Sequence, residues 1–494
     1  MKLVYNPTVS TLYNCSSEYV SRLTGFFSHD LDRDYLKSFE KLRSLPFTPA
    51  YSFKAELQSD DTYKVQIYSG FVKTILLDIY SGNAGISIKD FSIVSTRHKY
   101  EPSDLVISDK LYKHQKRIVE SVLHNKRGIV KSPTGSGKSF VIAELVRLFT
   151  ADNLSVLITV PTIDLLHQLT ENIKDYLILN GESPIKIGKV GDGNYDFENV
   201  TVGIPQSLSN TDKTAKYLRT IDVLIADEVH TCSTPTYGSV VEHLLHRAVS
   251  IGLSATPGNN IFLNAFFGSS IINVEESEMI EGDVIMEPII KFYKAPKGFL
   301  PNGLSKNAAS ISTLTDAHRY KTLAQVYNWL IVKNDKRNNL ILSKAIERID
   351  LNIGPVIIIV TKIKGEHSHG EMLRQAFLDR GYDLPIMSGY ISKKKRGKLL
   401  DDLRVNNIVG CIAGPKVLTN GISIPSLSTI ILAGAGKSDT EFIQRVGRIL
   451  RKKEGKERPV VVDFLDTQYW FNKQANSRLD TARNIYGESN VTII

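Results

Sequence analysis

The hydrophobic and polar positions follow two different periodic patterns, one before and one after about residue 105. Before about residue 105, apolar and polar residues alternate, as in Tyr51–Leu57 and Tyr63–Tyr68. A period of two is typical of half-buried antiparallel strands. A helical pattern over Glu18–Phe27 precedes these strands, and a polar connection at Ser95–Asp104 follows them. The pattern therefore predicts a small α+β domain over residues 1–105.

From about residue 106, short apolar runs alternate with helical patterns. The first set of predicted strands covers 128–130, 156–160, 200–204, 222–226 and 248–253. The pattern over 260–330 is undecided, and the rhythm then returns with strands at 356–360, 384–387, 408–413, 429–432 and 459–463. Strands that alternate with helices are typical of doubly wound parallel sheets. We therefore predict an α/β fold with two parallel-sheet domains in tandem behind the small α+β domain.

Composition narrows the class of protein without naming a function. The 494 residues are 42% hydrophobic and 23% charged, as in a soluble globular protein, and the net charge of +9 favours a polyanionic partner or serves solubility alone. The three cysteines are scattered singly, which favours a reducing compartment. The N-terminus has no apolar signal core, and no apolar run is long enough to span a bilayer. We expect a cytoplasmic protein, in the host cytoplasm if a phage encodes it.

The segment Lys131–Ser139 has the pattern of a phosphate-binding loop. It follows the short apolar strand at 128–130 and leads into a helical pattern. Glycines at 135 and 137 let backbone N–H groups approach an anion, and the helix N-terminus adds its dipole. In such a loop Lys138 would reach the β- and γ-phosphates of a nucleotide, and the Ser139 hydroxyl would hold Mg²⁺. The strict pattern has a glycine where this chain has Ser132.

Two carboxylates directly follow the predicted strand at 222–226. Asp227 is placed to hold Mg²⁺ and Glu228 to orient or deprotonate an attacking water, because ligands bind beyond the carboxyl ends of parallel strands. The alternative is that the pair only caps the next helix. His230 is either a link from the nucleotide to the rest of the site or a core histidine. Ser254–Thr256 follows another strand, where its hydroxyls could bond the acidic pair or form a plain turn before a proline.

The second α/β region contains an arginine cluster in the segment 444–451. Arg448 and Arg451 are three residues apart, which predicts that they share one helix face. Cations so placed could reach a γ-phosphate as arginine fingers. The alternative is a solvated basic helix, because more lysines and arginines follow. Gly447 inside the cluster would allow a close approach to another backbone. The basic run Lys393–Arg396 is either a nucleic-acid contact or a solvated helix start.

Taken in order, these segments resemble the motifs of superfamily 2 helicases. The matching segments are Lys113–Gln115 (Q motif), Ser132–Ser139 (motif I), Val160–Gln168 (Ia), Ile204–Leu208, Asp227–His230 (a DExH-type motif II), Ser254–Thr256 (III), Val356–Thr361 (IV), Thr419–Pro425 (V) and Gln444–Arg451 (VI). The resemblance implies two RecA-like domains, over 106–282 and 283–470, with a C-terminal helical tail over 471–494. It also implies an ATP-hydrolysing enzyme that uses ATP and Mg²⁺.

The resemblance carries family roles onto individual residues of this chain. It implies catalytic roles for Lys138, Asp227, Glu228, Gln444, Arg448 and Arg451. It implies ATP contacts by Gln115, Thr134, Gly135, Ser136, Gly137, Lys138, Ser139, His230 and Gly421, with Gln115 bidentate to adenine. It implies nucleic-acid contacts by Pro161, Thr162, Gln206, Ser207 and Thr419, and Mg²⁺ ligation by Ser139 and Asp227, partly through water.

Within the superfamily, the chain is most similar to the phage UvsW-type branch-migration helicases. The similarity lies in Asn420–Ser423, in Gly447–Lys452 and in the small domain ahead of the motor. It implies an ATP-dependent DNA helicase or translocase on branched or forked DNA in recombination and repair, with recombination or single-strand-binding proteins as partners and with the N-terminal domain gripping duplex DNA. An RNA helicase, a double-strand translocase that does not unwind, and an ATP-gated clamp with little turnover remain alternatives. A restriction motor would need a nuclease motif, and the sequence offers no convincing one.

Overall fold

The computed structural model divides the chain into two compact units. Residues 1–133 and 137–274 form the first unit, and residues 134–136 and 275–494 form the second. The structure describes residues 1–5, 9–28, 53–72, 75–76, 79, 92–95, 100–104, 106–244, 247–258, 261–310, 316–363, 365, 368–389, 391–415, 424–434 and 439–494.

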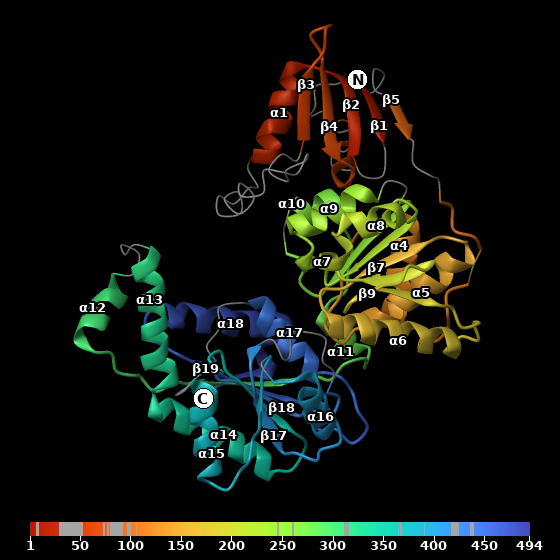
Figure 1. Ribbon diagram of the computed structural model, residues 1–494. Helices are drawn as coiled ribbons and strands as arrows, with labels where there is room; N and C mark the ends of the chain where they lie inside the picture. Colours follow the sequence, from red (N-terminus) through yellow and green to blue (C-terminus); the bar gives the residue numbers. More distant parts are fainter. Residues whose placement is uncertain are drawn as a thin grey trace. The chain divides into compact units, whose positions relative to one another are not determined.

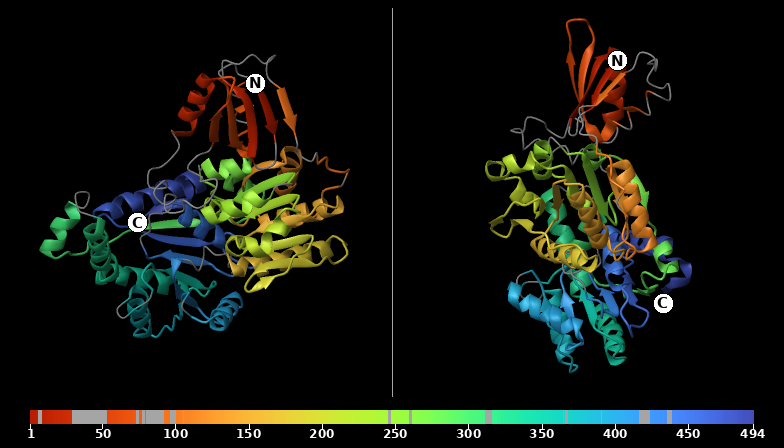
Figure 2. Two further views of the ribbon diagram at one scale, coloured as in Figure 1. Left: turned by 45° about the horizontal axis from the view of Figure 1, so that its top comes forward. Right: turned by 90° about the vertical axis from the view of Figure 1, so that its right-hand side faces the viewer.

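A five-stranded sheet forms the N-terminal part of the first unit (Figure 1). Its strands, in spatial order, are β3 (Phe53–Leu57), β4 (Tyr63–Tyr68), β2 (Val9–Cys15), β1 (Lys2–Tyr5) and β5 (Ser92–Ser95). Neighbouring strands are antiparallel except β1 and β5, which run parallel. Helix α1 (Ser17–Ser28) packs against β4, and Figure 2 shows it beside the strands. The predicted α+β character of this region is confirmed.

The N-terminal sheet and the first α/β domain share one hydrophobic cluster. Alternate residues of β4, Val65 and Ile67, are fully buried in it, as their period of two predicts. The short 3₁₀ helix η1 (Ser69–Phe71) contacts α10 (Ile261–Phe267) of the α/β domain, and Phe262 and Phe266 belong to the same cluster. Apolar burial of this kind fixes the small domain on the larger one.

The first α/β domain is built on an eight-stranded sheet. In spatial order the strands are β13 (Ser270–Asn273), β6 (Arg127–Lys131), β12 (Val249–Ser254), β11 (Val223–Asp227), β7 (Val156–Thr159), β10 (Val200–Gly203), β8 (Ile187–Gly191) and β9 (Asn194–Tyr195). All pairs are parallel except β8 with β9. The central strands are buried along their whole length, as their continuous apolar runs predict.

Helices cover both faces of this sheet (Figure 1). One layer contains α4 (Lys113–Asn125), α5 (Lys138–Ala151) and α6 (Ile163–Leu179), with α5 packed between the other two. The other layer contains α7 (Pro205–Leu208), α8 (Thr211–Leu218), α9 (Pro235–His243) and α10. From β6 the chain crosses the sheet in one direction, through α5 to β7 and through α6 to β8. From β10 it returns in the opposite direction, through α8, α9 and α10 to β11, β12 and β13. Right-handed crossovers then place the two sets on opposite faces.

The second unit contains a seven-stranded sheet whose described pairs are all parallel. In spatial order the strands are β16 (Ile386–Met387), β17 (Gly410–Ala413), β15 (Val356–Ile359), β18 (Thr429–Leu432), β19 (Val460–Leu465), β14 (Ile289–Lys294) and β20 (Val491–Ile493). Five of these strands correspond to the predicted ones. β14 and β20 were not anticipated, and they extend the sheet beyond β19.

Helices also flank the second sheet. The described helices are α11 (Glu276–Glu281), α12 (Asn302–Ala309), α13 (Asp316–Tyr327), α14 (Asp335–Asp350), α15 (His369–Leu378), α16 (Lys393–Arg404), α17 (Asp439–Ile449) and α18 (Trp470–Tyr486). α12 and α13 pack on each other, a short π-helix (Asn328–Val332) continues α13, and Phe471 of α18 shares a hydrophobic cluster with Leu330. The undecided stretch 260–330 therefore contains helices and the strands β13 and β14.

Two predictions from composition can be compared with the described residues. Within them, no helix is both long and apolar enough to cross a membrane. Cys15, Cys232 and Cys411 are buried and form no disulfide. Burial raises the pKa of the Cys411 thiol to about 12, so at neutral pH it stays protonated. The cysteines therefore serve as small core residues.

Candidate functional site

The glycine-rich loop connects β6 to the N-terminus of α5. Gly135 and Gly137 have φ angles of 91° and 77°, in the left-handed region that a side chain makes costly. Gly137 is the N-cap of α5, a helix of 14 residues. The loop begins on the sheet, because the Ser132 N–H donates to the Ser254 carbonyl of β12 at 3.0 Å. Left-handed glycines followed by a helix N-terminus make a backbone concavity that fits phosphate.

Lys138 and Ser139 occupy the first turn of α5. The Lys138 ammonium donates to the carbonyls of Ser132 and Pro133, each at 3.3 Å, so it lies against the loop from which it projects. Both side chains are partly exposed. The sequence-predicted loop is therefore present with its lysine turned onto its own backbone.

Gln115 lies beside the loop, on α4. Its Oε1 accepts the Tyr112 N–H at 2.9 Å, which caps the start of α4, and the residue is only 3% exposed. A Cβ added to Gly137 would stand 2.4 Å from the Gln115 Nε2, so a side chain at this position would displace the end of Gln115. The structure thus brings Gln115 to the loop and gives its carbonyl oxygen a structural partner. The bidentate adenine contact stays a prediction.

The acidic pair lies at the carboxyl end of β11. Asp227 is 8% exposed, and its Oδ1 accepts the Glu228 N–H at 3.0 Å. Glu228 has φ 52°, an unusual left-handed conformation for a residue with a side chain. Strain of this kind, of order 1–3 kcal/mol, concentrates at functional sites, where the surrounding structure enforces it. The turn directs Glu228 away from the strand axis and toward the neighbouring strand β12.

Ser254, the last residue of β12, connects the acidic pair to His230. Its hydroxyl donates to the Glu228 Oε2 at 3.4 Å and lies 3.0 Å from the His230 Nδ1. It also accepts the Thr256 N–H at 3.2 Å, which is the turn that the sequence offered as an alternative. Both interpretations of this segment therefore hold together. His230 is partly exposed and bonded to the site, so it is not a core histidine.

Parallel register places these groups along one edge of the first sheet. β12 lies between β6 and β11, so the glycine loop, Ser254 and Asp227 leave three neighbouring strands at the same edge. β7 and β10 are the next two strands, and the candidate nucleic-acid contacts follow them. Those candidates are Pro161, Thr162, Gln206 and Ser207. A single edge thus carries a phosphate-binding part and, beside it, a row of hydroxyl and amide groups.

Two of these candidates, Thr162 and Gln206, have polar groups available to a ligand. Thr162 is the N-cap of α6, and its Oγ1 accepts the Leu165 N–H at 3.3 Å, which leaves its hydroxyl proton for another acceptor. Gln206 is exposed in the short helix α7. Side chains of this type suit phosphate oxygens and carry no sequence information.

In the second unit, the arginine cluster differs from its predicted geometry. Arg448 lies on α17 and is 9% exposed, but α17 ends at Ile449 and Arg451 forms an antiparallel bridge with Ile285. The prediction of one shared helix face was therefore wrong. The helix stops because its carbonyls find other partners: Leu450 accepts the Met286 N–H at 2.7 Å, and Ile449 accepts the Lys456 ammonium at 2.6 Å.

The two arginines nevertheless lie within electrostatic reach of each other. Burial, and then the charge of Arg448, lower the pKa of Arg451 to about 10. Gln444, on the same helix, is 7% exposed. Two cations held close together favour an anion as a ligand. Thr419 and Gly421 fall outside the described residues.

The second unit also contains a cavity that sequence reasoning missed. It measures about 490 Å³ and lies where β15 and β18 end, against α17 and α18. Its wall includes Thr361, Arg445, Trp470 and Phe471.

Comparisons with known proteins agree with this geometry. A family model described as "Type III restriction enzyme, res subunit" matches residues 108–259, and the "Helicase conserved C-terminal domain" matches residues 338–453. The first match spans the glycine loop and the acidic pair, and the second spans the arginine cluster. The chain therefore belongs to the superfamily 2 helicases.

Three relatives extend the similarity over most of the chain. A helicase of Sulfolobus islandicus filamentous virus is 25% identical over 377 residues, 73% of this chain and 64% of the relative. "DNA 3'-5' translocase XPB2" of Sulfurisphaera tokodaii is 26% identical, over 71% of this chain and 81% of its own length. "ATP-dependent DNA helicase uvsW" of phage T4 is 24% identical, over 74% and 70%.

One solved structure supports the fold. Yeast Dbp5 bound to RNA and ADP BeF3 superposes with a TM-score of 0.54 and 18% identity, over 78% of this chain and 90% of the other. The predicted fold class, two tandem RecA-like domains behind a small α+β domain, is confirmed. The chain is an ATP-dependent helicase or translocase that acts on nucleic acid.

Proposed function

We propose that this protein is a DExH-type motor that remodels branched DNA, such as forks and junctions, by branch migration in recombination and repair. The observation that carries the proposal is the single sheet edge that joins the phosphate-binding loop, Ser254 and the acidic pair to the groups after β7 and β10. A nucleotide and a nucleic-acid strand would then bind along the same sheet edge. Hydrolysis of the nucleotide could be coupled to movement of the nucleic acid through the β-strands between the two sites.

The residues of the first unit support distinct roles in ATP hydrolysis. The loop N–H groups and Lys138 would bind the phosphates, and Ser139 and Asp227 supply the oxygen ligands that Mg²⁺ prefers. Mg²⁺ would neutralise phosphate charge. Glu228 would orient the attacking water and accept its proton, held in place by the Ser254 hydroxyl. His230 contacts the same Ser254 hydroxyl and would respond to changes at the acidic pair through it.

The residues of the second unit support a role in the transition state. We propose that Arg448 and Arg451 act as arginine fingers, with Gln444, Thr419 and Gly421 completing the nucleotide contacts that the family resemblance implies. Burial, and then the charge of Arg448, lower the pKa of Arg451, and an incoming γ-phosphate would offset both.

The preference for branched DNA rests on two supports. Two of the relatives are named as a DNA helicase and a DNA translocase. In addition, the N-terminal sheet is packed on the first α/β domain through η1 and α10, which gives the motor a second body to grip duplex DNA. The domain limits 1–105, 106–282, 283–470 and 471–494 belong to this proposal. Recombination or single-strand-binding proteins are the partners we propose, in the cytoplasm where such DNA lies.

A panel of substrates tests the proposal. ATPase and strand-separation rates would be measured side by side on forks, four-way junctions, linear duplex and RNA. We expect the highest stimulation and unwinding on the forked and four-way substrates, with a steep fall as salt rises. Equal stimulation by linear duplex without unwinding would favour a double-strand translocase, and stronger stimulation by RNA would favour an RNA helicase. Binding without turnover would indicate a clamp.

A further inference from the structure

A strap, described over residues 100–104 and 106–112, leads to α4 and runs back along α5. At the far end of α5, Asp152 accepts hydrogen bonds from the Tyr100 hydroxyl at 2.8 Å and from the Ser103 hydroxyl. At its near end the strap reaches Tyr112, whose N–H is held by Gln115 beside the glycine loop. The strap therefore spans the helix from its last turn to its phosphate-binding first turn.

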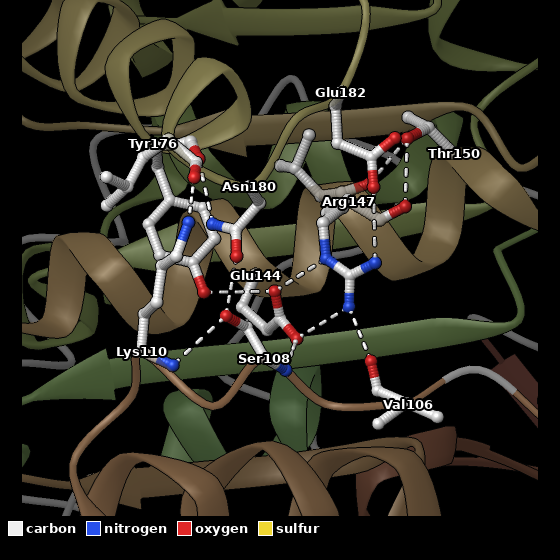
Figure 3. Close-up of polar contacts among 11 residues, drawn as sticks. Val106, Ser108, Lys110, Glu144, Arg147, Thr150, Tyr176, Asn180 and Glu182 are labelled. Atoms are coloured by element: carbon white, nitrogen blue, oxygen red, sulfur yellow. Dashed lines mark hydrogen bonds and ion pairs between the residues drawn. The ribbon is translucent and has the colours of Figure 1, made fainter.

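The middle of the strap is fastened by Glu144, a fully buried carboxylate of α5. Its Oε1 accepts the Ser108 N–H at 2.7 Å, and its Oε2 accepts the Tyr176 hydroxyl at 3.0 Å (Figure 3). Both oxygens also accept from Arg147, at 2.8 and 2.9 Å. Four donors therefore compensate a charge whose burial would otherwise cost several kcal/mol. Burial raises the pKa of Tyr176 to about 12, so at neutral pH it remains a donor.

Arg147 extends the fastening to the preceding strap residue. Its Nη2 donates to the Val106 carbonyl at 2.7 Å (Figure 3). The Ser108 hydroxyl donates to the Asn180 side chain of the α6 C-cap at 2.6 Å. The hydrogen bond from Arg147 to Glu144 raises the pKa of Arg147. The strap backbone is thus held on both sides of Ile107 by groups of α5, and the Ser108 side chain is held by the C-cap of α6.

The same network contacts the nucleotide side of α5. The ring of Tyr176 packs edge-on against Phe140, with centroids 5.9 Å apart, and Phe140 directly follows Ser139. Phe140 is 50% exposed, and Tyr112, at the end of the strap, is 57% exposed. The exposed Phe140 ring and the Gln115 amide thus border the glycine loop, and the exposed Tyr112 is bonded through its N–H to Gln115. An adenine ring stacks on aromatic faces and is read by amides, so this border suits a base more than a phosphate.

We propose that Glu144 and Arg147 are positioning residues that hold the end of the strap at Tyr112, and with it Gln115 at the start of α4, against the glycine loop and thereby set which base the site accepts. Three residues separate Ser108 from Tyr112, so loss of the contact at Ser108 would loosen Tyr112. Gln115, which accepts the Tyr112 N–H, would then lose its fixed position. Neither Glu144 nor Arg147 reaches the phosphates, so the network should influence base recognition more than hydrolysis. This inference rests on the proposed ATPase function.

The test is Glu144→Gln in the full chain, assayed for hydrolysis of ATP and of GTP. The substitution keeps the volume of Glu144 but turns an amide toward Arg147, which breaks the fastening. We expect the KM for ATP to rise about tenfold, the loss of roughly one charged hydrogen bond, with kcat changed less than about threefold. The KM for GTP should stay constant, so the preference for ATP falls about tenfold. Asp222→Asn is the control: that carboxylate also accepts a backbone N–H, from Ser155 at 3.0 Å, away from the strap.

A double variant separates positioning from stability. Glu144→Leu with Arg147→Met removes both charges together, a change that often leaves stability intact. We expect its melting temperature to stay close to that of the wild type while its preference for ATP stays low. Recovery of the ATP preference with the melting temperature would show a purely structural role and overturn the proposal, as would equal KM changes for ATP and GTP in Glu144→Gln. A wild type without ATPase activity would instead overturn the proposed function itself.

Discussion

The two parallel sheets share one construction but carry different groups where their strands end. In the first, β6, β12 and β11 end in a glycine loop, a serine hydroxyl and two acids. In the second, the groups at the ends of β15 and β18 bond one another: the Thr361 hydroxyl donates to the Gly434 carbonyl at 2.8 Å, and so does the Tyr327 hydroxyl at 3.1 Å. The same architecture thus carries a glycine loop and acids at one edge and, at the other, mutually bonded groups beside a cavity, so chemistry depends on the loops and not on the sheet.

Buried charges show the same contrast. In the first unit, the fully buried Glu144 fastens a strap beside the nucleotide loop. In the second, Arg337 is fully buried and makes a bidentate pair with Asp466, at 2.8 and 3.0 Å, and also donates to the Ala433 carbonyl. This pair joins α14 to the end of β19. The first ion pair, Glu144 with Arg147, therefore holds a segment beside the candidate site. The second, Arg337 with Asp466, holds a helix against the end of a strand.

The largest expected effect comes from the loop lysine. Lys138→Ala should lower ATP hydrolysis by about a thousandfold or more, because a charged donor to the transferring phosphate is lost. The unfolding curve should not change, since Lys138 bonds only carbonyls of its own loop. Steady-state ATPase and thermal melting check both parts. Lys174→Ala, an exposed lysine of α6, serves as the control, and near-normal turnover in Lys138→Ala would contradict the phosphate-site assignment.

The second effect concerns the arginines of the other domain. Arg448→Ala should leave nucleotide binding intact and lower turnover by about 10³-fold, the usual value of an arginine finger. Binding of a fluorescent ATP analogue and single-turnover hydrolysis separate the two quantities. Arg404→Ala, an exposed arginine of α16 in the same unit, is the matched control. If Arg448→Ala weakened only DNA binding, Arg448 would be a backbone-phosphate contact instead.

The third effect should be confined to the second unit. Arg337→Met leaves Asp466 charged and buried, so we expect the free energy of unfolding to fall by about 3–5 kcal/mol. Both tryptophans of the chain, Trp329 and Trp470, lie in this unit, so their fluorescence in urea reports its unfolding. Adding Asp466→Leu should recover most of the loss. A single variant with wild-type stability would show that the pair contributes nothing to the fold.

The smallest effect is a pH dependence. Burial, with Arg451 and Lys453 nearby, lowers the pKa of Lys456 to about 8 from its usual 10.5. Between those two values the unfolded chain binds more protons at Lys456 than the native chain. The free energy of unfolding therefore gains a rising contribution as pH increases from 8 to 10.5. Lys456→Met should flatten that rise, measured by tryptophan fluorescence in urea across this range. An unchanged slope would show that Lys456 titrates normally.

Much of the fold was predictable because its signals are local. Continuous apolar runs predicted the buried strands β7, β10, β11, β15 and β18 within one or two residues at each end. The elements that were missed are strands at or near sheet edges, among them β13, β14 and β20, and the helices α12 and α13. Short edge strands have weak periodicity, because only part of their surface is buried, and their pairing partners lie far away in sequence.

The candidate site was predictable to the extent that its chemistry follows the strands directly. Asp227 and the glycine loop could be assigned from the residue types and from the strands before them. The link from Glu228 through Ser254 to His230 was foreseen only in outline, because it requires β11 and β12 to be neighbours. The geometry of Arg451 was mispredicted, because residue spacing alone does not show where a helix will end.

The sequence by itself determined the phosphate-binding loop, the acidic pair, the alternation of strands and helices and the family. These features rest on local residue types and on periodicity, which the chain carries wherever it folds. Only the tertiary structure decided that Ser108 meets Glu144, 36 residues away, and that Arg451 leaves α17 to pair with Ile285. Such contacts depend on which distant segments become neighbours when apolar faces are buried. A buried carboxylate then takes whatever donors the packing brings within reach.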